Sequence, residues 1–264
     1  MKYSPRKIKT NVNISHTSPA KDFFLLLSGI FCVIIIVYFI LGLLVNVAVA
    51  RLPVQVEEGL GRVFKQFYEN AKNDEESRKL QGLLDKLVTG FPEEGRAFRV
   101  YLVENEMVNA VALPGGNIVV FTGLMKEVEA EEEISFVLAH ELGHFANRDH
   151  LKGLGRGLIL WVLSAGFLGY DNSVTALAGQ SLMGVQMKFS QAQETKADLF
   201  ALELMSEQFG TVAGAVAFMG KISAKEGKGM LAYYFSSHPH PEKRVKVIQD
   251  EIRLKGYNTK GSKK

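Results

Sequence analysis

The sequence predicts an α+β fold: a mostly helical domain with a small sheet, preceded by one N-terminal transmembrane helix. Three observations support this. An uncharged apolar run lies near the N-terminus, two alternating segments flank a Pro-Gly-Gly turn, and apolar residues recur at helical spacing in the remainder. Such periodicities are typical of half-buried strands and amphipathic helices. With 264 residues, the chain can bury a sizeable core.

Composition and charge exclude several classes of protein. The chain is 47% hydrophobic and 22% charged, which excludes a fully disordered protein. Its single cysteine, Cys32, excludes a disulfide scaffold and a cysteine-based zinc cluster. Residues 52–252 carry 20 Lys or Arg against 27 Asp or Glu, whereas both ends of the chain are basic. An acidic body argues against nucleic acid as a partner, because phosphate binding needs a concentrated basic face.

The first expected element is a membrane anchor over residues 23–50. These 28 residues carry no charge, and about 20 apolar residues suffice to cross the hydrocarbon core. Five Lys or Arg precede the run and only Arg51 follows it closely, so residues 1–22 are expected to form a basic cytoplasmic tail. A signal peptide cleaved after Ala50 is the alternative, but signal-peptide apolar cores are only roughly 7–15 residues long.

The remainder is expected to form one domain over residues 51–254. Between residues 54 and 87, apolar residues recur at helical spacing in two groups. Residues 98–103 alternate like a strand, and residues 109–113 and 117–122 resemble two strands joined by a turn. The rest of the domain is expected to be mainly helical.

Two further segments stand out by composition. Residues 157–170 form a second apolar stretch of 14 residues, which is too short to span a membrane unaided. A buried helix is the favoured interpretation, and a hairpin that dips into the membrane or rests on it is the alternative. Residues 255–264 are basic and are expected to form a disordered tail.

The chemistry is expected at the HELGH segment, residues 140–144. Residues four apart share one face of an α-helix, so His140 and His144 can direct ring nitrogens at one metal ion. Zinc accepts two imidazoles and one carboxylate and leaves a position open for water. Glu141 lies beside the first histidine, placed to take a proton from that water. A helix with two surface histidines is the alternative.

A third ligand is expected from a second helix, which begins near Glu194. Glu194 and Asp198 are four residues apart and hence on one helical face. One carboxylate can ligate zinc while the other accepts a hydrogen bond from a ligand histidine. Two acids at this spacing more often form a solvated face, so the inference depends on the upstream histidines.

An ordered set of segments resembles a known family. In chain order they are NAVALPGG, FTGL, HELGH, ETKAD, and SHP followed by Arg244. Together they are similar to gluzincin metallopeptidases of the HtpX and type I CAAX prenyl protease type, and the single anchor resembles the envelope-facing bacterial members. The resemblance implies a mostly helical zincin fold with a small sheet beside the active-site helix. It also implies one Zn²⁺ per chain, bound by His140, His144 and Glu194, with Glu141 as base and acid and Asp198 supporting a ligand.

The resemblance also implies roles outside the two helices. An edge strand would hold an extended peptide through main-chain hydrogen bonds, which makes Asn109 and Ala110 candidate substrate contacts; an ordinary hairpin is the alternative. His238 would either stabilise the oxyanion or occupy the open zinc position in a resting state; a surface-loop histidine is the alternative. One extra residue separates the family's usual arginine-histidine pair here, which leaves His150 without an assigned role.

These inferences predict a membrane-anchored zinc metalloendopeptidase. The expected location is a bacterial inner membrane, with residues 23–50 in the lipid bilayer and the domain in the periplasm. Expected substrates are proteins or peptides, in particular misfolded or membrane-proximal envelope proteins. A zinc-containing chaperone-like or binding module with little or latent proteolytic activity is the alternative, although a pure binder has no need of Glu141 as a base. The sequence leaves oligomeric state open.

Overall fold

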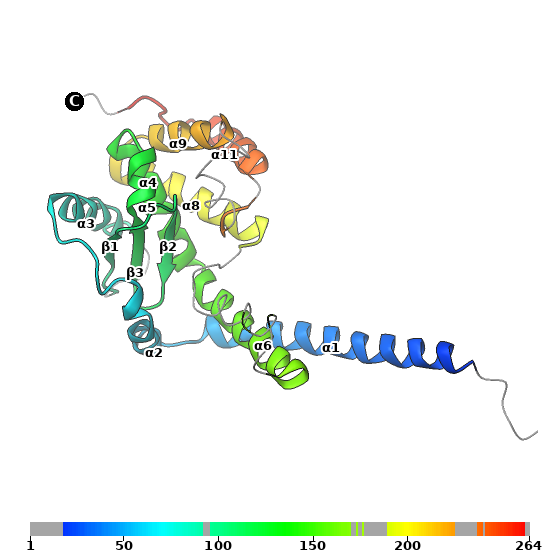
Figure 1. Ribbon diagram of the computed structural model, residues 1–264. Coiled ribbons are helices and arrows are strands. Elements are labelled where there is room, and N and C mark those ends of the chain that lie inside the picture. The colour runs from blue at the N-terminus through cyan, green and yellow to red at the C-terminus, as the bar shows by residue number, and fades with distance from the viewer. Residues whose placement is uncertain are drawn as a thin grey trace, which may run out of the picture.

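The computed structural model describes residues 18–91, 96–169, 189–224, 237–239 and 241–261, with residues 173 and 176. A long helix, α1 (Pro19–Ala50), extends from a body of helices around a small sheet (Figure 1). Most of the expected cytoplasmic tail, residues 1–17, lies outside the described residues.

Helix α1 has the length and composition expected of a membrane anchor. It contains 32 residues, and most of its large apolar side chains are exposed between Phe23 and Val47. About 20 apolar residues suffice for a span, so α1 is long and apolar enough to cross a membrane. A signal sequence near an N-terminus has the same two properties.

The elements before the sheet are helical, as the apolar spacing predicts. They are α2 (Val54–Gly61), the short 3₁₀ helix η1 (Arg62–Phe67) and α3 (Glu75–Val88). Asp74 caps α3, because its carboxylate accepts a hydrogen bond from the amide of Ser77 at 2.9 Å.

The small sheet has three strands in the order β1-β3-β2. β1 (Arg99–Val103) runs parallel to β3 (Asn117–Phe121), and β2 (Ala110–Leu113) runs antiparallel to β3. The turn between β2 and β3 contains Gly115 and Gly116 at φ of 82° and 76°, a conformation that favours glycine. All three expected strands are therefore present, and β2 lies at an edge of the described sheet.

The centre of the body is α5 (Glu131–Ala146), which follows the short α4 (Thr122–Glu127). All residues from Glu133 to Phe145 are buried, so α5 is covered on every side rather than amphipathic. This central position explains why the HELGH segment lies in the protein interior.

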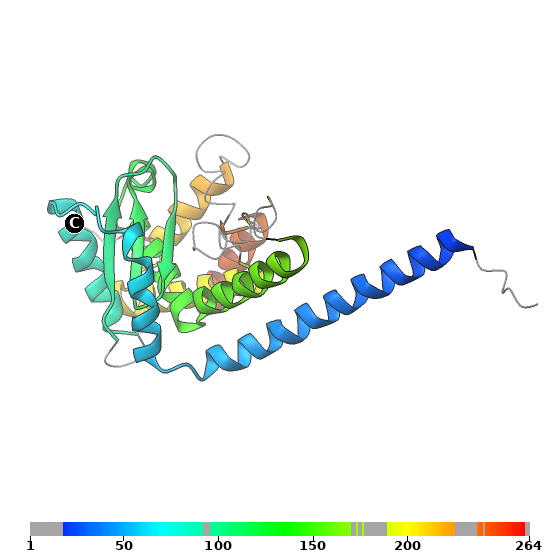
Figure 2. The same ribbon diagram turned by 60° about the horizontal axis from the view of Figure 1, so that its bottom comes forward.

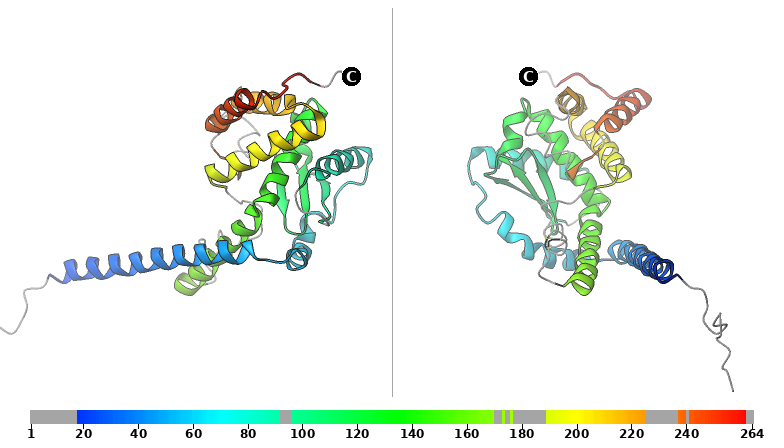
Figure 3. Two further views of the ribbon diagram at one scale, coloured as in Figure 1. Left: turned by 180° about the vertical axis from the view of Figure 1, so that it is seen from behind. Right: turned by 45° about the vertical axis from the view of Figure 1, so that its right-hand side comes forward.

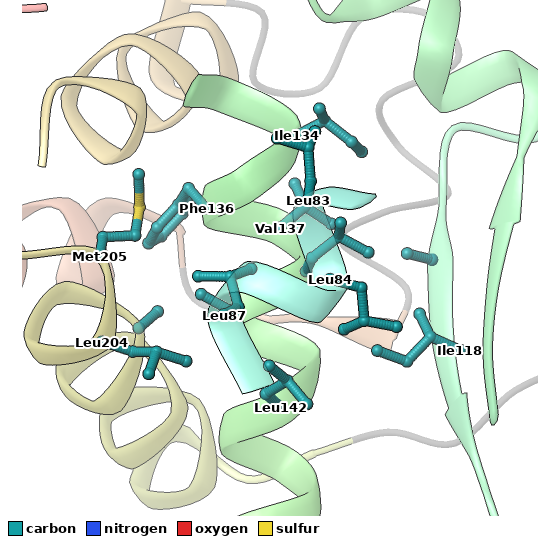
Figure 4. Packing of buried hydrophobic residues seen from close by; sticks show 14 of the residues in the cluster. Leu83, Leu84, Leu87, Ile118, Ile134, Phe136, Val137, Leu142, Leu204 and Met205 are labelled. Carbon is teal, nitrogen blue, oxygen red and sulfur yellow. The ribbon is translucent and has the colours of Figure 1, made fainter. Parts of the chain in front are cut away.

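Helices from the C-terminal half of the chain cover α5. α8 (Gln191–Phe209) and α9 (Ala213–Ala224) pack directly on it, and α11 (Pro241–Lys255) packs on both of these. Figures 1 and 3 show α9 and α11 at the end of the body far from α1. In Figure 4, leucine and valine side chains of α3 and α5 interdigitate beside Leu204 and Met205 of α8.

The apolar stretch 157–170 is not the buried helix that the sequence favoured. Its described part is the C-terminal portion of α6 (Asp149–Leu168), where Phe167 is 65% and Leu168 is 58% exposed. α6 packs mainly against α1 (Figure 2). The prediction was wrong because a short apolar run is equally compatible with the protein interior and with lipid.

Residues 255–261 of the expected C-terminal tail are described and contact the start of α9. The hydroxyl of Thr211 donates to the carbonyl oxygen of Lys260 at 2.7 Å and lies 3.1 Å from that of Asn258. The amide of Val212 also donates to the Asn258 carbonyl at 2.8 Å. These bonds fix the tail against the start of α9, a contact that composition cannot reveal.

Candidate active site

The HELGH segment occupies the C-terminal half of α5. Three glutamates at 131–133 lie in the first turn, where negative charge is stabilised by the helix dipole. The side chains of His140, Glu141 and His144 are all at 0% exposure. Buried polar groups need partners, so the surrounding residues decide what this site can do.

Helix α8 brings two acidic residues to α5. It begins with a capping box in which the side chains of Ser190 and Gln193 each bond the other residue's backbone amide. Glu194 and Asp198 follow on successive turns of one face, and both are at 0% exposure.

The close approach of α5 and α8 depends on Gly143 of the HELGH segment. A Cβ at this position would lie 2.7 Å from Cα and 2.9 Å from the carbonyl oxygen of Ala197. Any side chain at residue 143 would therefore displace α8 and, with it, Glu194. The glycine between the two histidines assembles the site, a role that the sequence pattern did not indicate.

Four side chains direct donor atoms at one point. Among the described residues, ligand atoms of His140, His144, Glu194 and His238 all lie within 4.8 Å of one another. Nε2 of His140 is 3.2 Å from Nε2 of His144 and 3.2 Å from Nδ1 of His238, which is itself 3.2 Å from Oε1 of Glu194. Tetrahedral zinc, with bonds of about 2.0–2.2 Å, separates its ligands by about 3.3–3.6 Å. The donor types and their spacing therefore fit zinc.

Carboxylates hold the outer nitrogens of the two α5 histidines. Nδ1 of His140 lies 2.9 Å from Oδ1 of Asp198, and Nδ1 of His144 lies 3.3 Å from Oδ2 of Asp149. Each Nδ1 can thus donate its hydrogen to a carboxylate, which turns the Nε2 lone pair toward the centre. Two lone pairs that face each other are stabilised by a cation between them.

Arg244 of α11 is a further member of the site. Its guanidinium donates to both carboxylate oxygens of Asp198 at 2.8 and 2.7 Å, and its Nη1 lies 2.7 Å from Oε2 of Glu194. Such a bidentate pair fixes geometry as well as charge. The sequence showed Arg244 only as part of a family pattern, because Arg244 and Asp198 lie 46 positions apart.

The electrostatics of the cluster favour a positive charge at its centre. Burial and the charge of Arg244 lower the pKa of His140 to about 4, so this ring is neutral. Burial also acts to lower the pKa of His144, but hydrogen bonds to Asp149 and Glu194 outweigh it and raise that pKa to about 9. Burial acts to raise the pKa of Glu194, yet a neighbouring histidine and Arg244 hold it well below its usual range. Metal binding here should therefore release protons.

Glu141 is buried beside the four donors. Neither of its carboxylate oxygens has a hydrogen-bond partner among the described residues, and Oε1 lies 3.6 Å from Nε2 of His238. Burial raises the pKa of Glu141, although His238, His144 and the nearby amide of Ala112 oppose the rise. An unpartnered carboxylate with a raised pKa can exchange a proton with a reactant.

His238 lies between the ligand atoms and Glu141. Only 1% of it is exposed, with Nδ1 facing Glu194 and Nε2 facing Glu141. The adjacent Ser237 donates its hydroxyl hydrogen to Oδ1 of Asn109 at 3.3 Å, which ties this segment to the sheet. His238 is therefore the fourth member of the group of donor atoms that could hold one metal ion.

Comparison with known proteins decides the family. Residues 71–252 match peptidase family M48. The chain belongs to this family. It is an M48 metallopeptidase by sequence, with an intact cluster of His140, His144 and Glu194.

Relatives of the M48 chain come from mitochondria and bacteria. It is 31% identical over 156 residues to the mitochondrial metalloendopeptidase OMA1 of Arabidopsis thaliana. This alignment covers 59% of this chain and 32% of OMA1. It is 29% identical over 189 residues to the metalloprotease LoiP of Escherichia coli K12, covering 70% and 73% of the two chains. A protease HtpX homolog from Desulfatibacillum aliphaticivorans is 27% identical over 228 residues, covering 69% and 72%. The chain thus spans about a third of OMA1 and nearly three quarters of the two bacterial proteins.

The M48 chain places both expected substrate contacts at the sheet edge. Asn109 precedes β2 and Ala110 begins it, and their exposures are only 5% and 0%. Oδ1 of Asn109 accepts hydrogen bonds from the amide of Ala110 at 3.0 Å and from Ser237. These side chains therefore support the strand and the His238 segment, and main-chain contact with a substrate stays a prediction.

His150 belongs to a second buried group of the M48 chain, which we term the Glu57 cluster: Glu57, Arg96 and His150. Nε2 of His150 lies 2.9 Å from Oε1 of Glu57, and Arg96 pairs with the other carboxylate oxygen. The cluster joins α2, the segment before β1 and α6. Sequence reasoning missed it because His150 and Glu57 are 93 positions apart.

Proposed function

We propose that this protein is a zinc-dependent metalloendopeptidase anchored in a membrane by α1. The observation that carries the proposal is the convergence of four donor side chains beside the unpartnered carboxylate of Glu141. Two imidazoles and one carboxylate, here His140, His144 and Glu194, are a ligand set of catalytic zinc. When bound, zinc supplies Lewis acidity toward a peptide carbonyl and lowers the pKa of a water molecule.

The residues of the chain supply the proton transfers and the alignment. Glu141 accepts a proton from the attacking water and delivers it to the leaving amine, a role that its position beside the four donor side chains supports. Asp198 and Asp149 hold the rings of the ligand histidines in their orientations. Arg244 holds Asp198 and Glu194 in turn.

We assign His238 to the fourth ligand position of a resting state. Its Nδ1 lies at a ligand-to-ligand distance from both His140 and Glu194, which supports this role over that of an oxyanion donor. A substrate carbonyl would have to displace the His238 ring from this position. Displacement of the His238 ring would then limit the rate of peptide cleavage.

The sheet favours an extended peptide as substrate. β2 lies at an edge of the described sheet, and the amide of its Ala112 is close enough to Glu141 to affect the pKa of that carboxyl. A peptide paired with the main chain at Asn109 and Ala110 would present its backbone beside the ligand cluster. Main-chain pairing demands little of the substrate sequence, which fits misfolded or membrane-proximal proteins.

We further propose a location in a bacterial inner membrane. Residues 1–22 would lie in the cytoplasm, residues 23–50 in the bilayer and the metallopeptidase domain, 51–254, in the periplasm. The basic residues before α1 support this orientation, because cytoplasmic flanks carry an excess of Lys and Arg. The bacterial relatives LoiP and the HtpX homolog are named as proteases, which supports a proteolytic role.

The deciding experiment measures zinc content and casein cleavage for the full-length chain in detergent, as wild type and as Glu141→Gln. We expect one zinc per chain in both and cleavage only by the wild type, because Glu141 moves protons but does not ligate. Glu131→Gln is the matched control, since Glu131 is an exposed residue of the same helix. Full activity in Glu141→Gln would contradict the assignment, and zinc without cleavage in any variant would favour a binding module.

A further inference from the structure

Helix α6 has two chemically different halves. Its N-terminal half, up to Arg156, carries charged residues that include Lys152. Its C-terminal half, residues 157–168, carries none. Five large apolar side chains of that half are exposed by 44 to 65%: Leu158, Leu160, Val162, Phe167 and Leu168. An exposed apolar surface of this size on one helix indicates an interaction surface.

The N-terminal half of α6 is docked on the end of the proposed anchor. A Cβ at Gly155 would lie 2.4 Å from Cγ1 of Val45, so the two helices touch through a glycine. The Arg156 guanidinium lies 3.4 Å from Oδ1 of Asn46. Figures 1 and 2 show α6 leaving the body beside α1, on the side toward which α1 extends.

A second contact locks the start of α6 to the end of α1. Arg148, directly before α6, donates to the carbonyl oxygens of Val49 and Leu52 at 2.9 and 2.6 Å. These acceptors include the Val49 carbonyl from the last turn of α1, which also accepts from the amide of Leu52 at 3.2 Å. The direction in which α6 points is therefore fixed relative to the anchor.

We propose that residues 157–168 of α6 enter the lipid bilayer beside α1 without crossing it. The membrane would then contact the protein through two helices rather than one. This inference rests on the proposed anchoring by α1 and is independent of the proposed peptidase activity.

The length of the apolar half of α6 limits how deeply it can enter the bilayer. Twelve helical residues from Gly157 to Leu168 span about 18 Å, whereas the hydrocarbon core is about 30 Å thick. The chain must also return to the same side, because Phe189 stacks on the ring of His144 with centroids 3.9 Å apart. A helix that enters the bilayer from one side without crossing it satisfies both conditions.

The covered face of α1 shows where a neighbour lies. Its half-buried or buried side chains recur on one side of the helix: Ile34, Tyr38, Leu41, Val45 and Val49. From Val49 to Ile34 this stripe runs about 22 Å along the axis, well into the proposed span. Among the described elements, α6 is the one that packs along α1.

The charges fit lipid as the occupant. Lys152, Arg156 and Lys196 line one pocket with Asn46, at the junction of α1, α6 and the start of α8. The acid in this pocket, Asp149, pairs with Lys152 and contacts His144, so three cations and one acid leave the pocket with a net positive charge. Cations at the foot of an apolar helix would face lipid phosphates while the apolar half reaches the acyl chains. This order of positive charge followed by apolar surface matches a lipid layer, and it gives no reason to expect a second copy of this chain there.

The test uses Trp161, the single tryptophan of the chain, which lies in the apolar half of α6. Full-length protein is reconstituted into phosphatidylcholine vesicles whose acyl chains carry bromine either near the carbonyl or near the chain end. We expect brominated lipid to quench Trp161. Moving the tryptophan to residue 167 (Trp161→Phe with Phe167→Trp) should increase quenching by the deep bromine, because six residues add about 9 Å.

Two relocated tryptophans, each in the Trp161→Phe background, serve as controls. Phe31→Trp reports on α1 and should be quenched, whereas Leu254→Trp, 78% exposed on α11, should keep its emission. Quenching at residue 31 but not at residue 161 overturns the proposal and leaves the anchor intact. If the tryptophans at residues 161 and 167 lie at equal depth in the bilayer, the proposal is also overturned, because α6 then lies flat on the membrane surface.

Two other outcomes are separated by the same samples. An emission at residue 161 that is blue-shifted but unquenched would mean that protein, such as a second copy, covers α6, and it overturns the proposal. No quenching at residue 31 overturns the anchor and with it this inference. Casein cleavage is measured on the same vesicles, so failure of the peptidase proposal is recorded independently of the position of α6.

Discussion

The protein buries two groups of charged side chains that use the same residue types in opposite ways. The ligand cluster comprises His140, His144, Glu194 and His238; the Glu57 cluster comprises Glu57, Arg96 and His150. Every member of both lies below 9% exposure. Each combines histidine with a carboxylate held by an arginine. Residue type and burial therefore do not distinguish a reactive site from a structural one here.

The direction of the lone pairs does distinguish them. In the ligand cluster, the Nε2 atoms of His140 and His144 face each other at 3.2 Å. In the Glu57 cluster, the Nε2 of His150 faces a carboxylate oxygen at 2.9 Å, and Arg96 faces the other oxygen. A donor thus meets an acceptor at each of these contacts in the Glu57 cluster, whereas two imidazole nitrogens meet in the ligand cluster and can share a cation, either a proton or a metal ion. A shared cation favours a binding site, and matched pairs favour a fixed junction.

The largest expected effect is on the ligand cluster, from Glu194→Gln. The substitution removes the anionic ligand and the carboxylate charge that faces Nη1 of Arg244. We expect zinc to be lost and casein cleavage to fall to background, measured by metal analysis and by initial rates. Glu203→Gln, an exposed residue on α8, is the matched control. Zinc retained at one per chain would show that Glu194 is not a ligand.

Glu57→Gln should instead lower stability and spare the metal. Removing one partner of a buried ion pair costs about 3–5 kcal/mol, because Arg96 and His150 both lose the Glu57 carboxylate that they contact. We expect a lower unfolding temperature in detergent with one zinc per chain still bound. Glu58→Gln, exposed and adjacent, should behave as the wild type. A loss of zinc at unchanged stability would mean that the two clusters act as one.

The difference in stability between wild type and Glu57→Gln should depend on pH. Burial acts to raise the pKa of Glu57, but the hydrogen bond to His150 and the charge of Arg96 hold it below the ordinary 4.5. A depressed carboxyl pKa stabilises the fold fully above the unfolded value and loses that contribution as pH falls. The stability gap between wild type and Glu57→Gln, measured with chelator in both, should therefore narrow below pH 4.5. A gap that is constant with pH would exclude the ionised carboxylate as its cause.

Local periodicity is the reason why part of the site could be predicted from sequence. His140 with His144, and Glu194 with Asp198, each lie four residues apart, and a helix brings such residues onto one face. The strands of the sheet were predictable in the same way, from alternation and a glycine turn. In each case the feature depends on residues that are close together in the sequence.

What could not be predicted depends on contacts between distant segments. Arg244 reaches Asp198 across 46 positions, and Glu57 reaches His150 across 93. The need for Gly143 arises only where α8 crosses α5. Sequence spacing contains no information about such crossings.

The error over residues 157–170 has a different origin. Their apolar composition was read correctly, but the same side chains suit the protein interior and a bilayer equally well. Only the position of α6 relative to α1 separates the two environments.

A smaller effect is expected from Asp198→Ala, because Asp198 orients a ligand without touching the metal. We expect zinc affinity to fall by about 10–100-fold, measured by competition with a chelator. The variant also leaves Arg244 without its bidentate partner. Asp250→Ala, with an exposed carboxylate on α11, is the control. Unchanged affinity would remove Asp198 from the support of His140.

The smallest and sharpest effect is expected from His238→Ala, the one ligand-cluster change that should not harm catalysis. His140, His144 and Glu194 remain, so zinc should stay bound at one per chain. If His238 fills the fourth position at rest, its removal opens that position and raises the initial rate of casein cleavage several-fold. If it instead stabilises the oxyanion, the rate should fall by about 10²–10³-fold. Because Nδ1 of His238 lies 3.2 Å from ligand atoms of both His140 and Glu194, we expect the rate to rise.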